Sequence, residues 1–221
     1  MSARLAVFDC DGTLVDSQAN ICLAMEQCFT GHGLAAPARA EIRRIVGLSL
    51  IEAMAALLPD APPEQHRAMA EDYKHAFQAL RGNGGLTDEP LFDGVAEALD
   101  AFEAAGWRLG VATGKSDRGL SLILAHHGLT GRFVTLQTAD RHPSKPHPSM
   151  LHAALAEAGA AAERSVMIGD TSFDMAMAVA AGVRPIGVAW GYHNAHELRD
   201  AGALVVADHA GELARLAAGT Y

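Results

Sequence analysis

The chain has 221 residues, which is enough for one large domain or for a core with a smaller appendage. Half of its residues are hydrophobic, and its formal net charge at pH 7 is −9. This negative charge argues against nucleic acid as a partner, because phosphate backbones select basic surfaces. The sequence contains no apolar run as long as a membrane span, so we expect no membrane partner either.

The cysteines and the N-terminal segment predict a cytoplasmic protein. Cys10, Cys22 and Cys28 show no CxxC spacing, and an odd, scattered set of thiols is typical of a reducing compartment. Residues 1–4 lead directly into an expected strand and do not resemble a signal peptide.

The pattern along the chain begins with one strand and continues with a long helical segment. We expect a strand over 4–9, helices from 16 to about 80, and a glycine-rich linker over 82–90. Helices and strands then alternate: helices at 94–105, 117–127, 148–158 and 173–181, strands at 107–112, 133–138, 165–168 and 185–189, and short elements near 197–199, 203–206 and 212–216.

This alternation predicts an α/β fold. Repeated βαβ units form a parallel sheet with helices on both faces, so we expect a Rossmann-like core. The helical segment interrupts that core after its first strand and is expected to form an inserted helical cap domain. The predicted division places 1–15 and 86–221 in the core and 16–85 in the cap.

Two acids, Asp9 and Asp11, follow the first apolar strand directly. Carboxylates at the end of a buried strand are costly unless they are paired or bind a cation. Ligands of open α/β sheets gather at the carboxyl ends of the strands. Further polar motifs follow other expected strands: residues 113–116 (TGKS), 144–146 (SKP) and 169–174 (GDTSFD).

These residue types together are suited to phosphoryl transfer. Mg²⁺ takes carboxylate and carbonyl oxygens as ligands. A carboxylate can attack phosphorus, and a neighbouring acid can give a proton to the leaving oxygen. A threonine hydroxyl, a lysine and backbone N–H groups can hold the phosphoryl oxygens.

The same motifs resemble those of the haloacid dehalogenase superfamily, in the branch that includes phosphoglycolate phosphatases. The run from Asp9 to Ser17 (DCDGTLVDS) resembles the first family motif, and residues 113–115 (TGK) resemble the second. Lys145-Pro146 resembles the third, and Gly169-Asp170 with Asp174 resembles the fourth. All of them occur in the order of the family, and the resemblance spans essentially the whole chain.

The resemblance implies a catalytic role for several residues. Asp9 would be the nucleophile that becomes an aspartyl-phosphate, and Asp11 would be the general acid and base. Thr113 would contact the phosphoryl group, and Lys145 would restrain and screen Asp9. Lys115, by contrast, is expected to be an exposed lysine at the start of a helix.

The resemblance also implies a Mg²⁺ cofactor. Asp9 and Asp170 would be ligands, Asp11 would contribute its backbone carbonyl, and Asp174 would support the metal site. The histidines show no convincing ligand set, so we expect surface or helix-end positions for residues such as His193.

Two glycines and a cap loop are candidate substrate contacts. Gly12 lets the backbone turn near the phosphate, and Gly114 is expected to present its N–H to the ligand. Residues 43–50 resemble the cap loop that relatives place over the active site, in which Arg43 would meet a substrate anion and Ser49 would donate a hydrogen bond. The alternative is a turn between helices with solvated arginines.

The sequence thus predicts a Mg²⁺-dependent phosphomonoesterase that acts on a small phosphorylated metabolite, with phosphoglycolate as the leading candidate. The resemblance implies that an acid at Asp11 favours ester hydrolysis over the dehalogenase chemistry of the same fold, which needs no proton for a leaving alcohol. The alternatives are a phosphomutase or pyrophosphatase of the superfamily, a phospho-accepting signalling module, or a binding protein without catalysis. The sequence does not distinguish a monomer from a homodimer.

Overall fold

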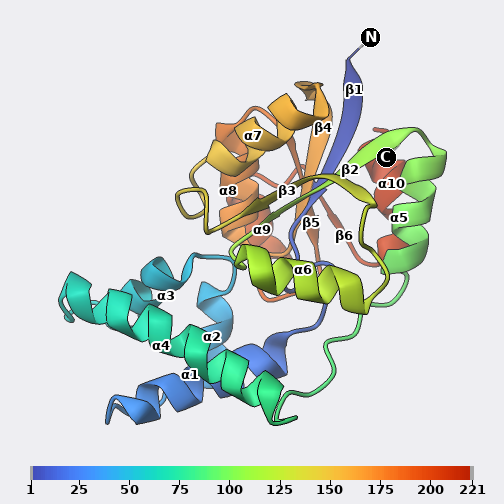
Figure 1. Ribbon diagram of the computed structural model, residues 1–221. Coiled ribbons are helices and arrows are strands. Elements are labelled where there is room, and N and C mark those ends of the chain that lie inside the picture. Colours follow the sequence, from blue (N-terminus) through green and yellow to red (C-terminus); the bar gives the residue numbers. More distant parts are fainter. Residues whose placement is uncertain (1, 220–221) are drawn as a thin grey trace.

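A parallel sheet forms the centre of the protein in the computed structural model, which describes residues 2–219 (Figure 1). Its six strands lie in the order β3-β2-β1-β4-β5-β6, and every neighbouring pair is parallel. The strands are β1 (Ala3–Phe8), β2 (Trp107–Thr113), β3 (Phe133–Thr138), β4 (Ala160–Gly169), β5 (Arg184–Val188) and β6 (Val205–Ala207). This arrangement confirms the predicted α/β, Rossmann-like core.

Both faces of the sheet are covered by helices, so its central strands are apolar on both sides. Ala6 and Phe8 of β1 face one cluster, with α5, α6 and α10, whereas Leu5 and Val7 face another, with α7 and α8. The core helices are α5 (Val95–Ala104), α6 (Asp117–His126), α7 (Ser149–Ala158), α8 (Ser172–Ala180), α9 (Ala195–Asp200) and α10 (Leu213–Ala217), with a 3₁₀ turn at Ala210–Glu212. None of the helices in the described residues is both long and apolar enough to cross a membrane.

Four helices follow β1 before the chain returns to the sheet; we call them, with their connecting loops, the cap. They are α1 (Gln18–Gly31), α2 (Arg39–Ile45), α3 (Leu50–Leu57) and α4 (Pro63–Gly82), and Figure 1 shows them below the sheet. Their apolar side chains form a cluster separate from the clusters on the sheet, with Met25, Met54 and Met69 fully buried in it. The cap therefore has a small hydrophobic core of its own.

The two connections between the cap and the sheet lie side by side. Val15 and Leu91 form an antiparallel bridge, and the Asp16 N–H donates to the Pro90 carbonyl at 2.9 Å. The predicted domain boundaries, after residue 15 and before residue 86, stay predictions.

One strand differs from the sequence expectation. The alanine-rich residues 160–164 were expected to be outside the strand at 165–168, yet β4 begins at Ala160 because Ala160 pairs with Ala3 of β1. Pairing with the neighbouring strand here outweighs the weak local preference of alanine.

Candidate active site

The candidate catalytic residues gather at the carboxyl edge of the sheet. Asp9 follows β1, Thr113 ends β2 and Asp170 follows β4, and these three strands are neighbours. Lys145 comes from the loop after β3, and Asp174 lies in the first turn of α8. All five are buried to 1 % exposure or less. Strand order thus brings together residues that are up to 165 positions apart in sequence.

Lys145 joins two of these acids. Its Nζ lies 2.9 Å from Asp9 Oδ1 and 2.7 Å from Asp174 Oδ1, and the three side chains are essentially inaccessible to water. Burial alone would lower the pKa of Lys145, but the charges of Asp174 and Asp9 outweigh it and raise that pKa. Lys145 therefore stays cationic and fixes the position of the Asp9 carboxylate.

The other oxygen of Asp174 is held by the start of its own helix. Asp174 Oδ2 accepts hydrogen bonds from Thr171 Oγ1 at 2.7 Å and from the Thr171 N–H at 3.1 Å. A side chain at Gly169 would collide with Asp174, because its Cβ would lie 2.4 Å from the Asp174 Cγ. Asp174 is therefore a tightly held residue whose two oxygens both already have partners.

Asp9, Asp170 and Asp174 make a compact, buried set of carboxylates. One oxygen from each lies within 4.8 Å of the other two. Asp9 Oδ2 is buried and has no hydrogen-bond partner. Burial raises the pKa of Asp9 to about 7, with the Asp174 charge adding to it, and burial followed by the Asp9 charge raises the pKa of Asp170.

These carboxylates fit a hard divalent cation. Lys145 supplies a single positive charge among three acids, so an excess of negative charge is buried. Oxygen ligands of this kind are what Mg²⁺ prefers. The unpartnered Asp9 Oδ2 is the atom that a cation or an electrophilic phosphorus would satisfy.

Asp170 is oriented by its neighbours, and Gly12 makes room for it. Asp170 Oδ1 accepts from Thr13 Oγ1 at 2.8 Å, and Oδ2 accepts from the Tyr192 N–H at 2.9 Å. Gly12 has a φ of 86°, and a Cβ there would lie 2.2 Å from Asp170 Oδ2. Gly12 is thus required by the backbone turn and by the approach of Asp170, and its contact with a substrate stays a prediction.

The Asp11 side chain has different partners from those of Asp9. Ser17 Oγ donates to Asp11 Oδ1, and Lys115 Nζ donates to the same oxygen at 2.7 Å. Asp11 is not part of the carboxylate set described above, which agrees with a proton-transfer role for its side chain.

Lys115 corrects the sequence expectation of an exposed lysine. Its side chain is only 14 % exposed and is paired with Asp11. Burial would lower the pKa of Lys115, but the Asp11 charge outweighs it and raises that pKa. The signal was the spacing from Thr113: side chains two residues apart at the end of a strand point to the same side.

A cavity of about 310 Å³ opens onto these residues. Asp9, Asp11, Thr113 and Lys115 line it from the core, and helices α1 to α4 with the loop after α2 enclose it from the cap. The more deeply buried Lys145, Asp170 and Asp174 lie behind this lining, in contact with Asp9. The cavity is therefore where a substrate would meet the Asp9 carboxylate.

Gly114 is the point at which the cap touches the core next to the cavity. A Cβ at this position would lie 2.6 Å from the Leu48 carbonyl oxygen and 2.8 Å from the Gly47 carbonyl oxygen. The cap loop therefore packs directly on the Gly114 backbone, an approach that only glycine permits. The predicted N–H contact of Gly114 with a substrate stays a prediction.

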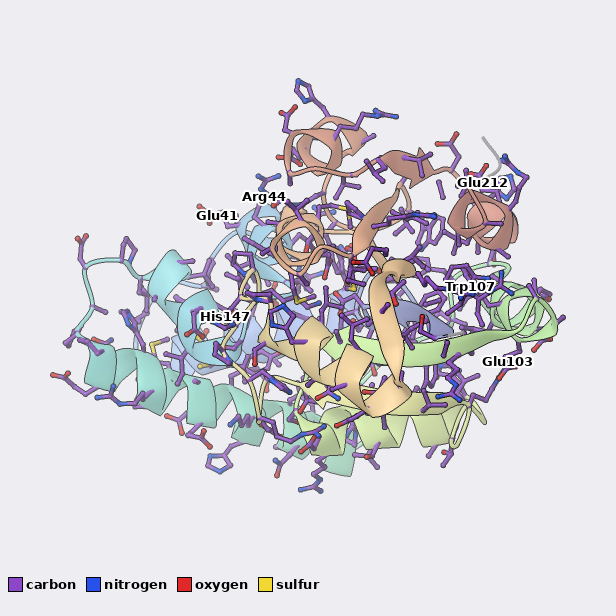
Figure 2. The ribbon with its side chains drawn as sticks, turned by 90° about the horizontal axis from the view of Figure 1, so that it is seen from above. Glu41, Arg44, Glu103, Trp107, His147 and Glu212 are labelled. Carbon is purple, nitrogen blue, oxygen red and sulfur yellow. The ribbon has the colours of Figure 1, made fainter. Side chains whose placement is uncertain are left out.

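Arg43 and Ser49 are not among the residues that line the cavity. Ser49 lies before α3, and its N–H donates to Ser144 Oγ of the core at 2.8 Å. The neighbouring Arg44, seen on the cap beside the core in Figure 2, pairs with Glu197. The structure thus uses this loop to join the cap to the core, and substrate contacts of Arg43 and Ser49 stay predictions.

His193 was expected at the surface or at a helix end; it lies next to Asn194, the N-cap of α9, but is buried, with 3 % exposure. Its Nε2 lies 3.3 Å from the Arg44 carbonyl oxygen, and its Nδ1 accepts from the Ser172 N–H at 3.1 Å. These two bonds place it between the cap and α8, which a local sequence pattern does not reveal.

The sequence and the fold both match known proteins. The family of haloacid dehalogenase-like hydrolases matches residues 6–188. A probable phosphatase, IndB, of Dickeya dadantii is 36 % identical over 210 residues, covering 92 % of this chain and 89 % of its own. A phosphoglycolate phosphatase of Xanthomonas campestris is 31 % identical over 190 residues, covering 86 % of this chain and 84 % of its own. The crystal structure of a predicted phosphatase from Clostridium acetobutylicum superposes with a TM-score of 0.87 at 23 % identity, covering 99 % of this chain and all of the other.

Proposed function

Because the chain belongs to the haloacid dehalogenase-like hydrolases and is a phosphatase, we propose that it hydrolyses the monoester of a small phosphorylated metabolite through an aspartyl-phosphate on Asp9. The observation that carries this proposal is the buried Asp9 Oδ2, which has no hydrogen-bond partner and belongs to a residue that lines the cavity. Asp9 Oδ1, by contrast, is held by Lys145.

In the first step, Asp9 Oδ2 attacks phosphorus and the bond from phosphorus to the alcohol oxygen breaks. Asp11, protonated at this stage, donates its proton to the departing oxygen. Thr113 and the ammonium of Lys145 are the nearby groups that can offset the charge on the phosphoryl oxygens. The products are the free alcohol and the aspartyl-phosphate.

In the second step, the Asp11 carboxylate removes a proton from water, and the resulting hydroxide oxygen attacks the phosphorus. The bond from phosphorus to Asp9 breaks, so inorganic phosphate leaves and Asp9 regains its carboxylate. Lys115 and Ser17 hold Asp11 in a fixed direction for both proton transfers. Asp11 ends the cycle protonated, ready for the next ester.

Asp9 and Asp170, together with the Asp11 backbone carbonyl, would hold the Mg²⁺ ion, and Asp174, whose oxygens accept from Lys145 and Thr171, would support the site. When bound, Mg²⁺ offsets the negative charge that the acids and the phosphoryl group bring together. The three side chains support this because they form a compact buried carboxylate set with one lysine between them.

We propose the substrate only as a class, the small phosphate monoesters. Phosphoglycolate is one member to assay, because phosphoglycolate phosphatases are among the relatives. A cytoplasmic location stays a prediction.

The test is phosphate release from a panel of small phosphate esters with Mg²⁺, for the wild type and for Asp9→Asn. Asp9→Asn should abolish release, because an amide does not form the aspartyl-phosphate. Asp208→Asn is the matched control, since Asp208 is an exposed acid outside the cavity lining, and should retain full activity. Full activity in Asp9→Asn would show that the nucleophile is wrong, and a burst of sugar-phosphate product with little free phosphate would favour a phosphomutase.

A further inference from the structure

The two ends of the cavity differ in chemistry. Its acidic lining residues, Asp9, Asp11 and Asp140, all come from the core. Its apolar side chains all come from the cap, on α1 to α4 and the loop after α2; examples are Ile21, Met25, Val46, Leu50, Tyr73 and Phe77. The reacting end is therefore polar, and the end that receives the rest of the substrate is apolar.

An aromatic wall forms part of the apolar end. Tyr73 and Phe77 lie four residues apart on α4, on the same face of the helix, with ring centroids 6.1 Å apart and an interplanar angle of 43°. Arg81, one further turn along, lies over the Phe77 ring at 5.4 Å. Aromatic rings that line a cavity favour a flat or apolar partner, because such a partner removes their surface from water.

The size of the cavity exceeds the needs of a two-carbon alcohol. Its volume of about 310 Å³ lies at the lower end of the range, about 300–1,000 Å³, of sites that bind drug-sized ligands. The glycolate part of phosphoglycolate would fill little of this space. Its carboxylate would also lie among apolar side chains, where an unpaired charge is costly.

The basic side chains in the lining argue for a different substrate, because they would favour an alcohol part that carries a negative charge. Lys115 is already paired with Asp11, and Lys74 with Glu71 at 2.8 Å. The Arg81 guanidinium lies over an aromatic ring, and Arg118, the fourth basic lining residue, lies on α6 of the core, at the polar end. The apolar surface is thus the larger unsatisfied feature of the cap end.

We infer that the preferred substrate is a phosphomonoester whose alcohol carries an extended apolar body, alkyl or aryl, which lies against Tyr73 and Phe77 while the phosphoryl group lies at Asp9. The inference rests on the proposed phosphatase function, and it names the substrate class of that site.

The test compares n-alkyl phosphates from methyl to hexyl with phosphoglycolate, using the wild type and Mg²⁺. Primary alkyl leaving groups differ little in basicity, so the series changes apolar contact and leaves the chemistry nearly constant. Burial of one methylene contributes about fourfold in kcat/KM at full contact. We expect hexyl phosphate to exceed both methyl phosphate and phosphoglycolate by at least about tenfold.

Variants on the aromatic wall locate the effect. Phe77→Ala should lower the hexyl-to-methyl ratio of kcat/KM by about tenfold, because the ring contact is lost. Ala53→Phe, which places a ring into the lining, should lower the same ratio by filling the space, and it guards against a folding defect in Phe77→Ala. Val134→Ala is the control: Val134 is 52 % exposed on β3, away from the cavity lining, and the ratio should not change.

The outcomes separate this inference from the proposed function. Suppose that every ester releases phosphate but the kcat/KM for phosphoglycolate equals or exceeds that for hexyl phosphate. This result would overturn the apolar-alcohol inference and leave the proposed phosphatase function standing. An unchanged ratio in both folded cap variants would overturn it as well. No release from any ester of the series by the wild type would contradict the proposed function itself.

Discussion

Gly114→Ala should separate closure of the cap from the chemistry at Asp9. The new Cβ would lie 2.6 Å from the Leu48 carbonyl oxygen and 2.8 Å from the Gly47 carbonyl oxygen. Ordinary contact of such atoms begins at 3.4 Å, so the cap loop must retreat by about 0.8 Å. Gly114 is not among the glycines with positive φ, so alanine fits the core backbone.

The displacement sets the expected magnitude. A shift of about 1 Å in a positioning element can cost about 10²-fold in rate, so kcat/KM should fall about 10- to 100-fold, or about 1.4 to 2.7 kcal/mol. Stability should change little or fall, because the clash with two backbone carbonyls offsets the gain of about 0.4–1 kcal/mol that alanine brings through the unfolded chain. Alanine keeps the backbone N–H, so a loss of activity would not come from a lost N–H contact with phosphate.

The assay measures kcat/KM by phosphate release and the free energy of unfolding by urea denaturation, in parallel. Gly31→Ala is the matched control, since a Cβ at Gly31 meets nothing within 4 Å and its φ is not positive. It should keep the wild-type kcat/KM. If Gly114→Ala also keeps it, the contact between the cap loop and Gly114 is not needed in turnover, and the steric reasoning is refuted.

The remaining predictions concern the charges of the site. Lys145→Ala should lower the free energy of unfolding of the metal-free protein by about 3–5 kcal/mol, because it leaves Asp9 and Asp174 buried without their cation; a change under about 1 kcal/mol in urea denaturation would contradict this. The pKa of Asp9 is raised to about 7, so the folded, metal-free protein holds a proton that the unfolded chain releases near pH 4. Its stability should therefore fall as pH rises from about 4 to 7, and its Mg²⁺ affinity by calorimetry should fall up to about tenfold per unit below pH 7, a trend that Asp9→Asn should weaken. Lys115→Met should reduce kcat/KM by about 10- to 100-fold, because Asp11 loses the ammonium that orients it; Lys115→Arg should recover part of this, and a full rate in Lys115→Met would exclude the positioning role.

The catalytic edge of the sheet could be predicted from the sequence because each of its residues is marked by the strand directly before it. Asp9, Thr113 and Asp170 each follow or end an apolar strand, and parallel strands bring their carboxyl ends to one edge whatever their exact order. Lys145 lies in the loop that follows β3, at the same edge. The motif order then selects one family, and the family match agrees with it.

The cap contacts could not be predicted because they depend on how separate helices pack. Tyr73 and Phe77 look like ordinary apolar positions of an amphipathic helix, and only the placement of α4 beside α1 and α3 turns them toward a cavity. The loop after Arg43 shows the same dependence: Val46 and Leu48 line the cavity, while Arg44 pairs with Glu197 of the core. The spacing from Thr113 places Lys115 on the side of the site, but only the structure shows that it pairs with Asp11.

The paired connections at Val15 and Leu91 also bear on how this protein can diversify. Because the chain leaves the sheet and returns to it at adjacent points, the cap behaves as one long excursion from a closed core. Such an excursion can be shortened, lengthened or replaced without shifting the register of β1 and its neighbours. The cap, which would contact the alcohol, can therefore change while the core, which would cleave the ester, is preserved. A graft of another helical cap between these two points is a direct route to a new substrate specificity.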